Sequence, residues 1–200
     1  MSNRERPPTV VYCEGAFTTT NGKTAHGLIR RSERYRIDYV VDSTHAGRDA
    51  GQLLDGKVTG QPVVRSVDEA VERAAAADEP LKQLVVGLAP DGGRLAGDHR
   101  AQIARALELG LSVDSGLHDF LGDDPKLAAL ALQGNLRIRD IRRPPPVDRL
   151  HFFDGRIEQV GCPRIAVLGT DSAVGKRTTA WMLVDALNAS GLRAVLVGTG

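Results

Sequence analysis

Residues 165–179 read Ile-Ala-Val-Leu-Gly-Thr-Asp-Ser-Ala-Val-Gly-Lys-Arg-Thr-Thr. The apolar run 165–168 predicts a buried strand, and Lys176 follows a glycine-bounded loop and opens a segment of helical spacing. This order predicts a phosphate-binding loop, because a helix start offers unpaired N–H groups and the positive end of its dipole. Glycines let the backbone wrap an anion, and the lysine adds a full charge. The expected cofactor-binding residues are Gly169, Thr170, Asp171, Ser172, Ala173, Val174, Gly175, Lys176, Arg177, Thr178 and Thr179.

The loop departs from the standard pattern in two ways. Five residues instead of four separate its two glycines, and Arg177 stands between Lys176 and the first threonine. The form Gly-Thr-Asp-x-x-Val-Gly-Lys resembles the dethiobiotin synthetase branch of the phosphate-loop proteins, in which a hydroxyl follows the lysine directly. The one-residue delay rotates the hydroxyl by about 100° around the helix. We expect Thr178 to be the Mg²⁺ ligand, with Thr179 as the second choice; a glycine-rich turn without a ligand is the alternative.

Short apolar runs alternate with helical patterns from residue 9 to residue 139. This alternation predicts a parallel sheet with helices on its faces, a Rossmann-like arrangement. The fold class is therefore α/β, with a Rossmann-like parallel-sheet N-terminal domain followed by a truncated P-loop NTPase-like α/β domain. The expected strands are residues 9–13, 37–41, 63–64, 84–88, 111–113 and 136–138, and the expected helices are residues 23–31, 49–54, 67–77, 98–109 and 125–133.

A run of three prolines, residues 144–146, cannot continue a helix and predicts an extended linker. We expect an N-terminal domain at residues 1–145, a linker at residues 146–163 and the start of the phosphate-loop domain at residues 164–200. A second apolar run, residues 195–197, predicts another strand of that domain. A doubly wound sheet needs more strands to bury both of its faces. We therefore expect these residues to be the N-terminal portion of a longer protein.

The composition argues against several classes of protein. The formal net charge is +1, so the chain is not drawn strongly to nucleic acid or to an anionic membrane. Cys13 and Cys162 make neither a disulfide framework nor a metal set. The first residues lack the apolar core of a signal peptide, and no apolar run approaches the ~18 residues that span a bilayer. We expect a soluble cytoplasmic homo-oligomer that acts on a small molecule.

Ligands of parallel sheets bind at the carboxyl ends of the strands. Asp42 ends the second expected strand, where a ribose-binding acid would lie, but the glycines of residues 15–27 are too far apart for a dinucleotide-binding turn. His118 follows another strand end and is either a catalytic base or a structural hydrogen-bonding residue. Residues 91–93, Asp-Gly-Gly, predict a plain turn.

Two further stretches concentrate charge. Residues 23–27, Lys-Thr-Ala-His-Gly, either hold a carboxylate or phosphate or form a solvated helix start. Residues 142–144, Arg-Arg-Pro, place two fixed charges before a rigid segment. Arginine pairs carboxylates in a bidentate way, so a carboxylate clamp is one interpretation. A solvated linker is the other, and the one that we favour.

The chain as a whole resembles the D-glutamate N-acetyltransferase-like family, two-domain proteins long described as a domain of unknown function. The resemblance implies a Rossmann-like N-terminal domain and a phosphate-loop C-terminal domain. It also implies an acyltransferase of D-amino acid metabolism, which in some members moves an acetyl group onto the amine of an acidic amino acid. The stretches that carry it are Glu14-Gly15, Lys23-Thr24-Ala25-His26-Gly27, residues 46–51, Gly116-Leu117-His118, residues 140–144 and residues 169–179.

Acetyl transfer suggests a role for each candidate residue. Acetyl-CoA carries a pyrophosphate and a 3′-phosphate, so the phosphate loop can hold acetyl-CoA or ATP, the latter with Mg²⁺. Arg30, Arg142 or Arg177 would hold a substrate carboxylate, and His118 or Asp171 would be the base. Two alternatives stay open. One is an ATP-dependent ligase that activates a carboxylate, and the other is a nucleotide-binding sensor without enzymatic activity.

Overall fold

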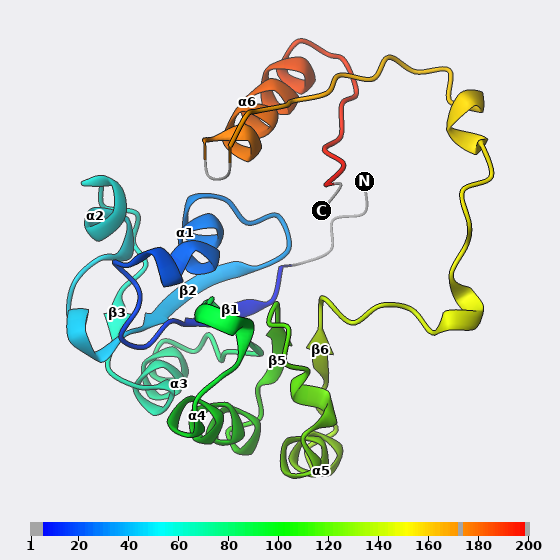
Figure 1. The fold of residues 1–200 in the computed structure, drawn as a ribbon. Helices are drawn as coiled ribbons and strands as arrows, with labels where there is room; N and C mark the ends of the chain where they lie inside the picture. Colours follow the sequence, from blue (N-terminus) through cyan, green and yellow to red (C-terminus); the bar gives the residue numbers. More distant parts are fainter. Residues whose placement is uncertain (1–5, 172–173, 199–200) are drawn as a thin grey trace. The chain divides into compact units, whose positions relative to one another are not determined.

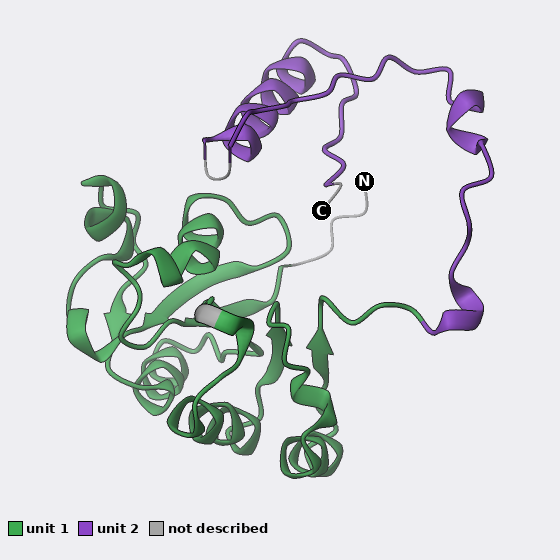
Figure 2. Ribbon diagram, viewed as in Figure 1, with its two compact units in different colours: residues 1–145 green, residues 146–200 purple. Residues whose placement is uncertain are grey.

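A computed structural model describes residues 6–171 and 174–198, except for the side chain of Asp91. The chain divides into two compact units, residues 1–145 and residues 146–200 (Figure 2). Each unit is described by itself below.

Unit 1 is built on a six-stranded parallel sheet in the order β3-β2-β1-β4-β5-β6 (Figure 1). This order is that of the doubly wound Rossmann fold and confirms the predicted fold class. The central strands β1 and β4 are rich in valine and buried, as expected where helices cover both faces. The strands are β1 (Pro8–Tyr12), β2 (Arg36–Val41), β3 (Val63–Val64), β4 (Gln83–Val86), β5 (Ser112–Ser115) and β6 (Ile138–Asp140).

Helices cover this sheet from both sides. Three helices, α3 to α5, lie on one face, and α1 lies on the other with α2 beside it (Figure 1). Each begins and ends within one residue of its predicted bounds, whereas the strands shift by up to two residues. The helices are α1 (Lys23–Arg30), α2 (Ala50–Asp55), α3 (Val67–Ala76), α4 (Gly97–Glu108) and α5 (Pro125–Gln133).

Side-chain caps explain why two of these helices begin where they do. Ser66 Oγ accepts a hydrogen bond of 3.1 Å from Glu69 N at the start of α3. Asp124 Oδ1 accepts one of 3.0 Å from Lys126 N at the start of α5, and Pro125 occupies the first helical position. Both arrangements satisfy N–H groups that the helix itself leaves without partners.

Short 3-10 turns follow several strands and shape the carboxyl edge of the sheet. Loops there occupy residues 13–22, 42–49, 87–96 and 116–124. The turns are η1 (Thr20–Gly22), η2 (Ser43–His45), η3 (Asp91–Gly93) and η4 (Leu121–Asp123).

Unit 2 contains the turns η5 (Val147–Arg149) and η6 (Arg156–Gln159) and the helix α6 (Lys176–Ala189). The helix begins at Lys176, as predicted. The predicted strands at residues 165–168 and 195–197 are wrong: neither segment is a strand, and Ile165 and Leu168 are 64% and 86% exposed. A strand is held by hydrogen bonds to a neighbour, and the described part of unit 2 offers these segments no pairing strand. Among the helices that the structure describes, none is long and apolar enough to cross a bilayer.

Candidate functional site

The predicted phosphate loop of unit 2 places its lysine against its own backbone. Lys176 is the first residue of α6, and Gly175 before it has a φ of 89°, a left-handed conformation that favours glycine. The stem of Lys176 packs over Gly169, where an added Cβ would lie only 3.0 Å from Lys176 Cδ. The Lys176 ammonium donates a hydrogen bond to the carbonyl of Asp171. The loop therefore keeps a positive charge at its backbone, and this arrangement suits a phosphate.

The helix start supplies further groups to this loop. No side chain caps the N-terminus of α6, so N–H groups of its first turn are not taken up by a cap. The side chains of Arg177, Thr178 and Thr179 are exposed in this first turn. The predicted contacts of Ser172 and Ala173 lie outside the described residues. The cofactor-binding role of the loop, and that of Thr178 toward Mg²⁺, stay predictions.

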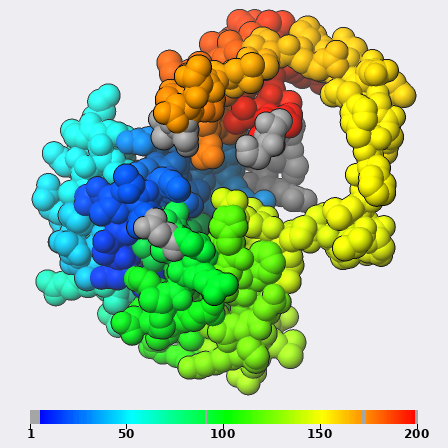
Figure 3. All heavy atoms as spheres, viewed as in Figure 1, coloured from blue at the N-terminus to red at the C-terminus, as the bar shows by residue number. Residues whose placement is uncertain are grey.

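In unit 1 the carboxyl edge is centred on the switch point between β1 and β4, where doubly wound sheets bind ligands. The loop of residues 13–22 crosses this point. Ala89 N donates a 2.7 Å hydrogen bond to Asn21 O, and Ala25 N donates one of 3.3 Å to Gly87 O. Figure 3 shows the early segment (blue) beside the segment that follows β4 (green) on the surface of unit 1. In dinucleotide-binding folds, the N–H groups at the start of this helix bind a phosphate. Here one of them, Ala25 N, is bonded to the backbone of the protein itself.

Asp42, at the end of β2, holds the same loop in place. Its carboxylate is fully buried and accepts hydrogen bonds of 3.0 Å from Phe17 N and 3.0 Å from Thr44 N. Glu14 extends this link, because its carboxylate accepts a 2.8 Å hydrogen bond from Ser43 N. The acid that stands at the ribose position of the fold therefore joins two loops of the chain.

Residues 23–27 contribute to the same closure. The imidazole of His26 donates from Nε2 to the carbonyl of Phe17, and the two rings meet edge to face at 5.8 Å. Gly22 is required there, since a Cβ would lie 2.6 Å from Ala16 O. His26 is thus engaged by the loop, whereas Lys23 is exposed.

His118 stands exposed in the loop that follows β5. Its ring packs on Gly93, where a Cβ would lie 2.7 Å from His118 Cδ2 and where φ is +66°. Asp119 next to it donates from N to Gly93 O at 3.3 Å and forms an ion pair with Arg100 of α4. The Asp-Gly-Gly stretch, predicted as a plain turn, is the 3-10 turn η3 and supports the histidine.

The candidate carboxylate-binding arginines differ in how they are already engaged. Arg30 forms two hydrogen bonds to Asp55, of 2.9 and 2.7 Å, and this guanidinium lowers the pKa of the Asp55 carboxyl. Arg142 donates from Nε to Gly116 O at 2.6 Å, two residues before His118. Among the described residues, no carboxylate forms an ion pair with Arg142. The structure therefore brings Arg142 to the loop of His118 but leaves Arg30 on another partner.

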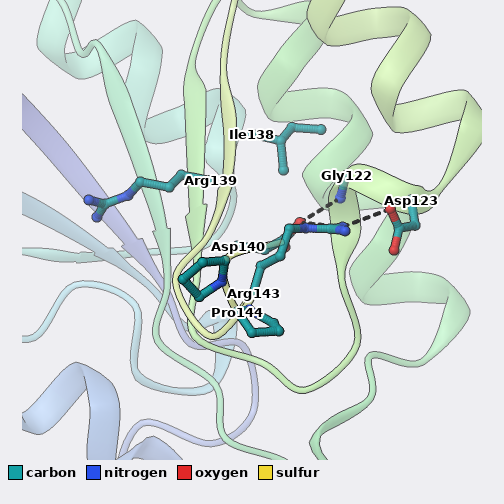
Figure 4. A pocket seen from close by; sticks show the side chains of 8 residues that line it. Gly122, Asp123, Ile138, Arg139, Asp140, Arg143 and Pro144 are labelled. Carbon is teal, nitrogen blue, oxygen red and sulfur yellow. Dashed lines mark hydrogen bonds and ion pairs between the residues drawn. The ribbon is translucent and has the colours of Figure 1, made fainter. Parts of the chain in front are cut away.

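Arg143, next in the chain, has a structural role. Its guanidinium lies 2.7 Å from Asp123 and 3.5 Å from Asp140, and it stacks 4.4 Å from the centre of the Phe120 ring. Asp140 in turn accepts a hydrogen bond from Gly122 N (Figure 4). An open cavity of about 520 Å³ at this end of β6 is lined in part by Asp123, Asp140 and Arg143. Arg143 is thus not a free clamp, and its ion pairs tie this exposed segment to unit 1.

Sequence reasoning missed a buried polar cluster in the sheet. Asp114 in β5 accepts hydrogen bonds from the Tyr35 hydroxyl and, at 2.5 Å, from Arg139 of β6. Burial raises the pKa of Tyr35 to about 12, and the hydrogen bond to Asp114 adds to this shift. An acidic residue at a buried position inside a strand, flanked by Val113 and Ser115, was the signal that could have found it.

No group of three or more acidic, histidine or cysteine side chains within the described ranges could hold a metal ion.

The sheet order and the glycine loop before α6 together define an α/β protein with a Rossmann-like unit followed by a P-loop. Residues 43–144 match the "Domain of unknown function (DUF1611_N) Rossmann-like domain", and residues 151–200 match the "Domain of unknown function (DUF1611_C) P-loop domain". The chain belongs to this DUF1611 family.

Two relatives of this chain carry the same name. A protein of Tritonibacter scottomollicae named D-glutamate N-acetyltransferase is 35% identical over 130 residues, which are 65% of this chain and 37% of that protein. A second of that name, from a Pseudoalteromonas species, is 32% identical over 119 residues, 60% of this chain and 35% of its own. The crystal structure of a DUF1611 family protein from Anabaena variabilis is 33% identical with a TM-score of 0.84, covering 98% of this chain and 54% of that one. The chain thus spans little more than half the length of this solved relative, and its matches to the two curated proteins cover about a third of theirs.

Proposed function

We propose that the protein is an N-acetyltransferase that moves an acetyl group from acetyl-CoA to the amine of an acidic amino acid. The observation that carries this proposal is the pair of relatives named D-glutamate N-acetyltransferase, each more than 30% identical to this chain. The matches cover part of each relative, so the acceptor amino acid and the use of acetyl-CoA belong to the proposal.

The phosphate loop is the proposed site for the phosphates of the acetyl donor. Bound acetyl-CoA supplies the acetyl group as a thioester. Lys176 and the uncapped first turn of α6 would hold a phosphate, and Gly169 gives the lysine stem room to lie against the loop. If the ligand is a magnesium nucleotide, Thr178 would be the metal ligand.

Unit 1 supplies candidates for the acceptor amino acid. Arg142 would hold a substrate carboxylate, because its Nε is fixed on Gly116 and its charge meets no carboxylate among the described residues. His118 on the same loop would take the proton from the substrate amine, and Asp171 of the phosphate loop is the alternative base. Arg177 remains a second carboxylate partner, whereas Arg30 would first have to give up Asp55.

The test is turnover by the full chain with acetyl-CoA and D-glutamate, followed by release of the CoA thiol and by mass spectrometry of the N-acetyl product. Lys176→Ala removes a charged hydrogen-bond donor worth about 1.5–3 kcal/mol, so kcat/KM should fall at least about 10-fold. Lys126→Ala removes an equivalent charge from the exposed surface of α5 and should leave kcat/KM unchanged. Turnover by Lys176→Ala at the wild-type rate would exclude the loop from the reaction.

A second candidate function follows from the loop itself. The five residues between Gly169 and Gly175 favour an ATP-dependent synthetase that activates a carboxylate. Release of ADP that requires both Mg²⁺ and a carboxylate substrate, without consumption of acetyl-CoA, would select this function. Tight ATP binding without any turnover would instead select a nucleotide sensor.

A further inference from the structure

Three polar side chains form a line of hydrogen bonds at the carboxyl edge of unit 1. Asp42 follows β2, His45 closes the turn η2, and Thr18 lies in the loop that follows β1. His45 Nδ1 lies 3.3 Å from Asp42 Oδ2, and His45 Nε2 lies 3.4 Å from Thr18 Oγ1. Loops at this edge carry the ligand sites of doubly wound sheets.

The chemistry of the three groups fixes the direction of these bonds. A carboxylate can only accept, so His45 Nδ1 carries a hydrogen and donates it as a hydrogen bond to Asp42 Oδ2. In the tautomer that this bond selects, the lone pair is on Nε2, where it can accept a hydrogen bond from the Thr18 hydroxyl. A hydroxyl next to a histidine, with the histidine oriented by a buried carboxylate, is the arrangement of an activated nucleophile. Thr18 is then the nucleophile, His45 its base and Asp42 the positioning residue. Both distances exceed the usual range for such bonds and would have to shorten for the proton to move.

The loops do not need the Thr18–His45 contact to stay together. Asp42 already holds the first loop through Phe17 N at 3.0 Å, and Glu14 holds the second through Ser43 N at 2.8 Å. Thr18 is exposed, and His45 is 24% exposed, so a substrate can reach the hydroxyl and the ring. The exposed Thr18–His45 contact would therefore add little to the stability of a link between the two loops.

We infer that Thr18 is a nucleophile that accepts an acyl group, with His45 as its base and Asp42 as the residue that positions the histidine. The inference rests on the proposed acyl transfer and adds a covalent intermediate to it. Thr18 Oγ1 forms a bond to the thioester carbonyl carbon while its proton moves to His45 Nε2. The C–S bond then breaks, and the leaving thiolate takes that proton.

The second half of the reaction returns the enzyme to its starting state. The neutral amine of the acceptor attacks the carbonyl carbon of the threonine ester and forms the C–N bond. His118 has already taken the ammonium proton of the acceptor, and the second amine proton now passes to His45 Nε2. The C–O bond to Thr18 breaks, and Thr18 Oγ1 takes this second proton back. No oxidant or metal is required by these steps.

The experiment uses p-nitrophenyl acetate, an acyl donor without phosphates, on the full chain. After brief incubation and an acid quench, mass spectrometry of the peptide that contains Thr18 should find one acetyl group on this residue. Thr18→Val should abolish the label, and His45→Gln should slow labelling by about 10²–10⁴-fold. Thr18→Ser should retain the label, and so should the matched control Thr20→Ala, which removes another exposed threonine hydroxyl of the same loop.

Acetyl-CoA in place of p-nitrophenyl acetate separates this inference from the proposed function. Labelling of Thr18 by the ester but not by acetyl-CoA would retain the nucleophile and overturn the proposed donor. Turnover of acetyl-CoA and D-glutamate with no acetyl group on Thr18 from either donor would overturn the nucleophile and retain the function. Circular dichroism of each variant shows that it is folded, and a folded Thr18→Val enzyme with wild-type turnover would also overturn the inference.

Discussion

Gly93 lies directly against the imidazole of His118, so that a Cβ on the glycine would stand 2.7 Å from Cδ2 of the histidine. The contact joins the loop after β4 to the loop after β5 at the edge where the proposed acceptor site lies. Two conditions require glycine here at once, because the backbone has a φ of +66° and the space above it is filled by the ring.

Gly93→Ala should therefore affect both stability and activity. The left-handed backbone alone costs a residue with a Cβ about 1–2 kcal/mol, and the methyl group would also push the His118 ring aside. Urea unfolding should show the loss of stability, and kcat should fall if His118 is the base. Gly97→Ala is the matched control, since nothing lies within 4 Å of a Cβ at that position. Equal effects of the two substitutions would contradict the proposed support of His118 by Gly93.

Gly169→Ala tests whether the packing of the Lys176 stem against Gly169 matters for binding at the phosphate loop. The new Cβ would lie 3.0 Å from Lys176 Cδ and 3.0 Å from Val174 Cγ2, so the lysine stem must move. We expect affinity for acetyl-CoA or ATP, whichever binds, to fall about 10-fold, which corresponds to about 1.4 kcal/mol. Calorimetric titration measures this change directly. Gly161→Ala, with open space at its Cβ, should bind the ligand like the wild type. Unchanged affinity of the Gly169→Ala protein would contradict a role for the packing of Lys176 on Gly169.

The buried hydroxyl of Tyr35 predicts a pH dependence of stability at high pH. Its pKa rises from 10.0 to about 12, mainly through burial, so the folded state keeps a proton that the unfolded chain loses. This contribution is complete below pH 10 and is lost as the pH rises toward 12, at about 1.4 kcal/mol per pH unit.

Tyr35→Phe should make the free energy of unfolding fall less steeply between pH 10 and pH 12. The measurement is a series of urea titrations of both proteins across that range. Cys13, whose pKa burial also raises to about 12, contributes with the same sign in both proteins and cancels in the comparison. Parallel slopes for the two proteins would show that the Tyr35 hydroxyl is not held as described.

The two cysteines should react at very different rates. Cys13 is buried, and burial raises the pKa of its thiol to about 12, so little of the reactive thiolate is present at neutral pH. Cys162 is exposed. A thiol reagent that releases a coloured leaving group should label Cys162 in the native protein and Cys13 only after unfolding. Cys162→Ser should then remove the native reaction, and rapid reaction of that variant would contradict the burial of Cys13.

The sheet and its helices could be predicted because their signals are local. Runs such as residues 10–12 and 84–86 are apolar throughout, as central parallel strands are, and the helices between them have a regular apolar spacing with Ser66 or Pro125 at their starts. The strands of unit 2 were predicted wrongly for a related reason. An apolar run shows that a segment is suited to a strand, but the strand forms only when a neighbouring strand supplies its hydrogen bonds.

The contacts that shape the carboxyl edge could not be read from local patterns. Asp42 binds Phe17 N across 25 positions of the chain, and Tyr35 binds Asp114 across 79. No sequence periodicity or motif indicates contacts between residues so far apart in the chain. His118 was named from its position after a strand and Arg142 as a charge before a rigid proline segment, but their supports, Gly93 and Gly116, became visible only once the strands were ordered in the sheet.

The buried carboxylate of Asp42 also sets a rule for engineering this scaffold. One charge holds the segments after β1 and β2 together: replacing residues 13–22 would leave the buried carboxylate of Asp42 without its donor Phe17 N, and replacing residues 42–49 would remove the carboxylate itself. A redesign of acceptor preference at this edge therefore has to exchange residues 13–22 and 42–49 as a single cassette.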